Sequence, residues 1–202
     1  SSLNGLYVLH EKRIIHRDIK PANILRGKDG VKLADLGLAR GQKDMLDHCP
    51  RGTVAYMSPE QYTDFNNADE RSDIYSLGAT IFQLYTGREL YQGESLDDIL
   101  ESHAIETTPA ITDYVHDCPQ SLNYIIRKMI AKNPADRYQN VQKVLEDWHA
   151  LINGAVDVKH LPSIIEVRGL SGTTSNLKPQ KEIQRNNKPK SLKIILLAAL
   201  II

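Results

Sequence analysis

Residues 16–25, with the sequence HRDIKPANIL, place an aspartate, a lysine and an asparagine at fixed offsets close to the start of the 202-residue chain. Phosphoryl transfer from a nucleotide needs a group that takes the proton of the attacking hydroxyl. It also needs acidic and amide ligands for Mg²⁺, and a cation near the migrating phosphoryl group. Asp18, Asn23 and Lys20 are residues of these types. The stretch therefore indicates phosphoryl-transfer chemistry, provided that a further acidic ligand follows.

Two further short motifs follow this stretch in order. Residues 35–37 (DLG) come after a predicted hairpin, and residues 58–60 (SPE) come after the stretch GTVAYM. Each triplet alone is a weak indication, but all of them in this order, followed by SDIYSLGATIFQLYTG, are very specific. Over residues 1–153 the chain resembles the protein kinases, and among them the bacterial-type, receptor-like serine/threonine kinases.

The resemblance implies roles for five residues, with ATP and Mg²⁺ as cofactors. Asp18 would accept or orient the proton of the attacking hydroxyl, while Asn23 and Asp35 would hold Mg²⁺ between the ATP phosphates. Lys20 would reach the γ-phosphate, and Thr53 would tie the substrate loop to Asp18 and Lys20. Lys20 and Thr53 favour Ser and Thr as the acceptors in substrate proteins. Each residue alone is more simply a turn, cap or solvated residue, but their joint arrangement favours the functional interpretation.

The resemblance also implies structural roles. Asp73 would hold the backbone of the catalytic loop, or act as a plain helix cap, and both can be true. Glu60 and Arg137 would form a buried ion pair that joins the activation segment to the helices. His16 and Leu25 would pack under the active site, with Leu25 beside the nucleotide.

One expectation concerns regulation. The segment from Asp35 to Thr53 holds no Ser, Thr or Tyr before Thr53. In relatives with an arginine before the catalytic aspartate, a phosphate on this segment pairs with that arginine. Arg17 is present here, so Asp44 or Asp47 could be its fixed anionic partner, or both could be solvated charges. If one of these carboxylates pairs with Arg17, the enzyme needs no phosphate on this segment.

The elements that must position these residues follow from hydrophobic spacing. An opening amphipathic helix is predicted, with an inward face of Leu3, Leu6, Tyr7, His10 and Ile14. Apolar residues 24–25 and 31–33 flank Gly-Lys-Asp-Gly, which predicts a β-hairpin. Residues 35–70 show no periodicity, so a long functional loop is expected there.

Four helices are expected after this loop. The first is capped by Ser72, has Leu84 on its inward face and ends at Thr86-Gly87. The others are expected from a Ser95–Asp98 capping box to Ile105, over Leu122–Ala131 after a Ser121 cap, and over Asn140–Ile152. The fold class is therefore mainly α with one hairpin, as in the C-terminal helical lobe of the α+β protein-kinase fold.

The family's N-terminal lobe carries a Gly-rich loop and a strand lysine, and neither G-x-G-x-x-G nor V-A-I-K occurs here. The fifteen residues before His16 leave no room for a sheet. We therefore expect residues 1–153 to be the C-terminal lobe of a kinase domain, truncated at both ends and close to inert alone. The parent protein would be an active enzyme. The alternative is a non-catalytic, kinase-like interaction module.

Beyond residue 153 the composition changes. Residues 154–191 are expected to form a basic, flexible juxtamembrane linker, and residues 192–202 the start of a truncated transmembrane helix. The parent protein is then expected on the cytoplasmic face of a membrane, with a homodimer as a possible state. The chain's 25 basic and 25 acidic residues balance, which gives no reason to expect nucleic acid as a partner. Cys49 and Cys118 are expected to be free thiols.

Overall fold

The computed structural model describes residues 2–28, 30–35, 51–64, 68–93, 96–105 and 107–153. Its helices and strands, in chain order, are α1 (Ser2–Glu11), β1 (Ile24–Gly27), β2 (Gly30–Leu33), α3 (Arg51–Val54), α4 (Pro59–Thr63), α5 (Glu70–Thr86), α6 (Leu96–Ile105), α7 (Gln120–Met129) and α8 (Val141–Ile152). Short 3₁₀ turns lie at Pro21–Asn23 (η1), Ile111–Asp113 (η3) and Pro134–Asp136 (η4). The expected helix-rich fold with a single hairpin is therefore present in the described residues.

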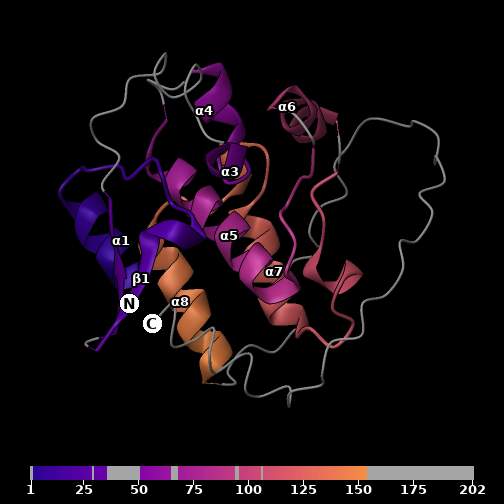
Figure 1. The fold of residues 1–202 in the computed structure, drawn as a ribbon. Helices are drawn as coiled ribbons and strands as arrows, with labels where there is room; N and C mark the ends of the chain where they lie inside the picture. Colours follow the sequence, from indigo (N-terminus) through magenta and orange to yellow (C-terminus); the bar gives the residue numbers. More distant parts are fainter. Residues whose placement is uncertain are drawn as a thin grey trace.

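Helix α5 lies in the middle of Figure 1 with α7 packed beside it, and α8 packs against α1 and α7. Every residue from Ser72 to Phe82 is buried, because helices pack against it from several sides. The prediction that Ser72 caps this helix is wrong. Asp69 is the N-cap, and its carboxylate accepts a hydrogen bond from the Arg71 N–H. The predicted end is confirmed, since Gly87 adopts the left-handed conformation with φ 76°.

Two further predictions, on the inward face of α5 and on the start of α7, differ from the structure. Leu84 does not face inward as expected, because 44% of it is exposed near the end of α5. Helix α7 begins at Gln120 after Pro119, so Ser121 is a buried residue of its first turn rather than the cap. The expected helix over Asn140–Ile152 is present as α8, and Asn140 is its N-cap, because its side chain accepts a hydrogen bond from the Lys143 N–H.

The hairpin forms as predicted, with antiparallel β1 and β2 in a register that pairs Ile24 with Leu33 and Leu25 with Lys32. Ile24 and Leu33 pack against the core, so their neighbours in each strand face the other way. This alternation explains why Leu25 is 54% exposed. His16 is fully buried as expected, whereas Leu25 lies at the surface and its expected place beside the nucleotide stays a prediction.

The expected long loop between residues 35 and 70 contains two short helices, α3 and α4. Helix α4 starts at Pro59, where the fixed φ of proline suits a first helical position. The N–H and hydroxyl of Ser58 both donate to Gln61 Oε1, at 3.1 and 3.0 Å. Helices of four or five residues are too short to produce a helical repeat in the sequence, which is why periodicity missed them.

Several predictions lie outside the described residues. They concern Asp44, Asp47, Cys49, Ser95, the linker 154–191 and the apolar segment 192–202. Within the described ranges, no helix is both long enough and apolar enough to cross a membrane. The membrane anchor therefore stays a prediction, and so does the pairing of Arg17 with Asp44 or Asp47. Cys118 is a buried free thiol, as expected.

Gly78 of α5 allows this helix to approach the C-terminal end of α7 closely. A Cβ at this position would lie 2.7 Å from Ile130 Cγ2 and 2.8 Å from Met129 Cβ. We expect Gly78→Ala to lower the free energy of unfolding by about 1–3 kcal/mol, because the added methyl group must push α7 away from α5. Urea denaturation checks this value.

Gly5 of α1 is the matched control, because a Cβ there would meet nothing within 4 Å. Gly5→Ala should raise the free energy of unfolding by about 0.5–1 kcal/mol through helix propensity alone. If both variants are stabilised, the packing argument for Gly78 is wrong.

Candidate active site

The catalytic loop is fixed by the carboxylate of Asp73, which is fully buried in the first turn of α5. The His16 N–H donates to Asp73 Oδ2 and the Arg17 N–H to Oδ1, each at 2.8 Å. His10 Nε2 lies 2.8 Å from the same Oδ2. Arg17 has φ 63°, a left-handed conformation that a side chain of its type adopts only when held. The contact expected for Asp73 is thus present, while the alternative role of helix cap belongs to Asp69.

Asp18 lies at the centre of a buried hydrogen-bond network. Lys20 Nζ donates to Asp18 Oδ2 and to Thr53 Oγ1, each at 2.9 Å. Asn23 Nδ2 donates to the Asp18 backbone oxygen at 2.8 Å and to Oδ2 at 3.1 Å. Thr53 therefore reaches Asp18 through Lys20. Asp18 Oδ1 is buried and has no hydrogen-bond partner within the described part of the chain.

The two residues expected to hold Mg²⁺ are brought together by the hairpin. The Ala34 N–H at the end of β2 donates to the Asn23 backbone oxygen at 2.9 Å, and Asp35 follows directly. Asp35 is exposed, with φ 58°. Because the Asn23 amide group donates to Asp18, its Oδ1 is the atom available as a ligand.

This donor set suits Mg²⁺, which proteins hold by one or two carboxylates together with substrate phosphates. The described residues contain no group of three or more His, Cys, Asp or Glu side chains that could hold a metal ion by themselves. One exposed carboxylate and one amide oxygen fit an ion that arrives with a nucleotide.

A second buried interaction holds the segment that follows Thr53. Arg137 Nη1 and Nη2 donate to the two carboxylate oxygens of Glu60, at 2.6 and 2.8 Å. The remaining donors of Arg137 reach the backbone oxygens of Ala131, Lys132 and Arg71. Burial raises the pKa of Glu60, but the hydrogen bonds and charge of Arg137 and the Ser72 hydroxyl outweigh it and leave the pKa below its usual value. The ion pair implied by the resemblance is therefore formed.

The motifs and their geometry agree with one known family. The family model described as protein kinase domain matches residues 1–149, most of the chain. The chain belongs to the protein kinase family.

Similar kinases come from bacteria. The chain is 37% identical over 153 residues to serine/threonine-protein kinase PknL of Mycobacterium tuberculosis, covering 74% of this chain and 38% of PknL. It is 39% identical over 156 residues to PrkC of Bacillus subtilis (75% and 23% covered). It is 36% identical over 163 residues to a probable serine/threonine-protein kinase of Corynebacterium efficiens (76% and 24%). The predicted bacterial serine/threonine type is confirmed, and the chain spans less than two fifths of each relative.

Gln61 is a residue of the kinase site that sequence analysis missed. Its Nε2 donates to the Arg17 backbone oxygen at 3.1 Å, while its Oε1 caps α4 at Ser58. It thereby joins the helix after Thr53 to the strained position of the catalytic loop. The sequence offered one indication, a polar residue directly after the SPE motif. His10 was assigned only to the inward face of the first helix, and its contact with Asp73 was also missed.

A buried histidine, which the sequence did not single out, links α6 to the residues that follow Thr53. His103 lies among the rings of Tyr62, Tyr75 and Tyr91, with centroid distances of 4.2–6.0 Å. The Tyr62 hydroxyl lies 3.5 Å from His103 Nε2 and donates to the Val54 backbone oxygen at 2.7 Å. This cluster of four rings fixes the backbone next to Thr53.

Removing the anion from the Glu60–Arg137 pair tests its importance. Because Arg137 is only 2% exposed, Glu60→Gln leaves a buried cation without its partner. We expect the free energy of unfolding in urea to fall by about 3–5 kcal/mol. Glu146→Gln, which removes the exposed Lys143–Glu146 pair, should change it by no measurable amount. Similar effects of the two substitutions would contradict the assignment.

His103 should make the stability of the kinase fold depend on pH. Burial, followed by the positive charges of Lys132 and Arg137, lowers the pKa of His103 from 6.5 to about 3. The unfolded chain binds a proton below pH ~6.5 and the folded chain does not, so this contribution is complete above pH ~6.5 and is lost as the pH falls toward 3. At ~1.4 kcal/mol per pH unit, lowering the pH from 7 to 5 should cost about 2 kcal/mol.

The measurement is urea denaturation at several pH values. His103→Leu should show a flatter pH dependence than the parent chain, whatever its absolute stability. His149→Gln, at an exposed position of α8, should retain the parent's pH dependence. If His103→Leu retains it as well, the pH dependence comes from other groups.

Proposed function

We propose that this chain provides the catalytic and substrate-binding part of a serine/threonine protein kinase, which transfers the γ-phosphoryl group of ATP to Ser or Thr hydroxyls of proteins. The observation that carries the proposal is the position of Lys20 Nζ, at 2.9 Å from both Asp18 Oδ2 and Thr53 Oγ1. This bridge joins the proton acceptor and the substrate segment through a cation. Family membership and the bacterial serine/threonine relatives support it.

The two carboxylate oxygens of Asp18 have different surroundings, and this difference suits general base catalysis. Oδ2 is held by Lys20 and Asn23, whereas Oδ1 has no partner among the described residues. Oδ1 would accept the hydrogen bond of the substrate hydroxyl and orient its oxygen toward the phosphorus. Lys20 would place its charge near the transferred group. Mg²⁺, when bound, neutralises charge on the phosphates, and Asn23 Oδ1 and Asp35 would hold it.

A nucleotide-clamping lobe would be needed in addition. Residues 1–153 contain neither a Gly-rich phosphate loop nor a strand lysine. The exposed side chain of Leu25, beside the catalytic loop, would contact the nucleotide from below. We therefore propose that the described helices form the C-terminal lobe and that the chain alone has very little kinase activity.

The test joins the chain to the nucleotide lobe of a relative such as PrkC and compares single variants. Asp18→Asn should lower the phosphoryl-transfer rate by about 10²–10⁴-fold with little change in ATP binding, because Asp18 contacts the acceptor hydroxyl. Asp35→Asn should weaken Mg²⁺-dependent ATP binding, because it removes the charged metal ligand. Radiolabelled phosphate transfer and nucleotide titration measure the two effects.

Glu146→Gln, on the exposed face of α8, is the control that should keep full activity. A joined protein that is folded and binds ATP, but never transfers phosphate, would favour the alternative of a non-catalytic interaction module. Equal losses of ATP binding in Asp18→Asn and Asp35→Asn would overturn the division of roles.

A further inference from the structure

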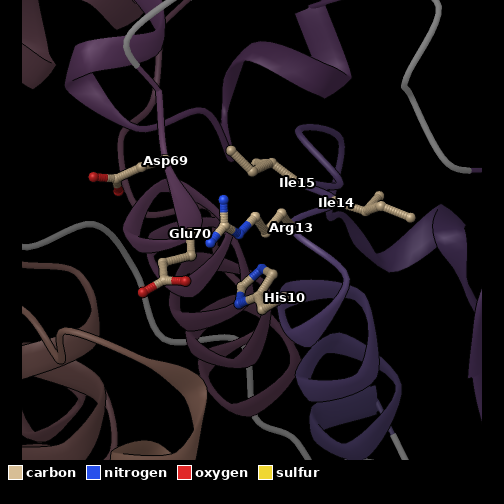
Figure 2. Close-up of a pocket in the computed structure, with 6 residues that line it drawn as sticks. All are labelled: His10, Arg13, Ile14, Ile15, Asp69 and Glu70. Carbon is tan, nitrogen blue, oxygen red and sulfur yellow. The ribbon is translucent and has the colours of Figure 1, made fainter.

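The catalytic loop is held on its entry side by α5. The N–H groups of His16 and Arg17 donate to Asp73, and the chain before them lies against the start of the same helix. One cavity there is lined by residues of both parts, namely His10, Arg13, Ile14, Ile15, Asp69 and Glu70 (Figure 2). The hydrogen bonds from Asp73 end at the Arg17 N–H. The next peptide group, which leads to Asp18, therefore depends on another anchor.

The peptide group between Arg17 and Asp18 makes two hydrogen bonds to the residues that the structure describes. Its carbonyl oxygen accepts one from Gln61 Nε2, at 3.1 Å. Its N–H donates to His16 Nδ1 at 3.4 Å, which is long for a hydrogen bond. Because a peptide group is planar, a bond at the carbonyl oxygen also fixes the N–H of Asp18. Gln61 is therefore the closer of the two anchors of the residue that carries the catalytic carboxylate.

The side-chain amide of Gln61 can be oriented in one way only. The Ser58 N–H must donate, so the atom that faces it is Oε1, and the Arg17 carbonyl must accept, so Nε2 faces it. The Ser58 hydroxyl also donates to Oε1, at 3.0 Å. Gln61 is 1% exposed, so water competes little for these bonds. The first turn of α4 and the peptide group of Asp18 therefore share one side chain.

We propose that Gln61 is a positioning residue, which makes the placement of the Asp18 carboxylate depend on the formation of α4. Arg17 has φ 63°, a conformation that persists only where the surroundings hold it. If the first turn of α4 opens, Gln61 loses its support at Ser58, and the Arg17 carbonyl loses its donor. The peptide group can then rotate and turn Asp18 out of position. The consequence for catalysis rests on the function proposed above, whereas the consequence for the loop does not.

This connection is separate from the one that Lys20 makes. Lys20 Nζ joins Thr53 to the Asp18 side chain, whereas Gln61 joins α4 to the backbone before Asp18. The alternative is that Gln61 only caps α4, in which case its bond to Arg17 satisfies a buried carbonyl and transmits nothing. The two interpretations differ in what a change at Ser58 does to the catalytic loop.

The first test removes a hydroxyl from each end of α4 and measures hydrogen exchange at the Asp18 amide of the full chain by NMR. Ser58→Ala deletes one donor to Gln61 Oε1 and does not touch the catalytic loop. Thr63→Ala is the matched control, because its hydroxyl lies at the exposed far end of α4. Ser58→Ala should speed exchange at Asp18 about two- to fivefold, and Thr63→Ala should leave it unchanged. Equal effects of the two variants would overturn the proposal.

Gln61→Glu tests the bond itself. The substituted carboxylate still accepts from the Ser58 N–H and hydroxyl, which favour its ionised form, but it has no proton to donate to the Arg17 carbonyl. We expect exchange at Asp18 to become about three- to tenfold faster. In this background, Ser58→Ala should have no further effect at Asp18, because the connection is already broken. A further effect of the same size as in the parent chain would show that Gln61 is not the connection.

Gln139→Glu is the control for the change of an amide to a carboxylate. Gln139 also donates to a backbone oxygen, that of Arg137 at 2.9 Å, but it is exposed and lies outside the catalytic loop and α4. Exchange at Asp18 should be the same in this variant as in the parent chain. Faster exchange in both glutamate variants would mean that any such substitution loosens the fold, and the proposal would be wrong.

The joined protein described under the proposed function adds a kinetic readout. Gln61→Glu should lower kcat about ten- to hundredfold, because a displaced proton acceptor loses much of its effect, and should leave the KM for ATP within about twofold. A KM for ATP that rises by the same factor would indicate a general loss of structure and overturn the positioning role. If the parent joined protein transfers no phosphate, the proposed function fails, while the exchange measurements still decide whether Gln61 holds the loop.

Discussion

The buried carboxylate of Asp73 is the interaction on which the rest of the site depends. A charged group without water is unfavourable unless hydrogen bonds replace its solvation. Asp73 obtains these bonds from two backbone amides of the catalytic loop and from His10. The same bonds hold Arg17 in a conformation that its side chain disfavours. These hydrogen bonds therefore offset both the cost of burying the charge of Asp73 and the cost of straining Arg17, and the loop geometry is the result.

Asp73 belongs to helix α5, and the contacts of this helix hold the site in place. One turn of α5 presents Asp73 to the catalytic loop and Ser72 to Glu60. Glu60 in turn binds Arg137, which sits between the end of α7 and the start of α8. The catalytic loop and the substrate segment are thus both anchored to one buried helix. A shift of either segment would leave buried charges without partners, which is far more costly than the loss of a surface contact.

The sequence was sufficient to predict the contacts of residues that stand in specific motifs. It was insufficient for residues whose partners are determined by the fold. The contacts of Lys20 with Asp18 and Thr53, and of Glu60 with Arg137, followed from the family resemblance. The end of α5 followed from Gly87, because glycine is favoured at the left-handed position that ends a helix. The start of α5 was misplaced because Asp69 and Ser72 are equally good caps by residue type, and only the fold gives Ser72 to Glu60. The role expected for Leu25 cannot be read from burial, because a two-stranded hairpin buries only one of its faces and Leu25 lies on the other.

His10, Gln61 and His103 show why the remaining contacts of the site could not be predicted from the sequence. Each contacts residues far away in sequence, and none belongs to a spaced motif. Gln61 binds the backbone oxygen of the same Arg17 whose N–H is held by Asp73, so the strained residue is fixed on both of its peptide groups. The side chain of Asp18 follows directly after this fixed residue. Its Oδ2 is turned toward Lys20 and Asn23, and Oδ1 has no hydrogen-bond partner among the residues that the structure describes. The orientation of the Asp18 carboxylate is therefore determined in part by the bonds that side chains of α4 and α5 make to the backbone of Arg17.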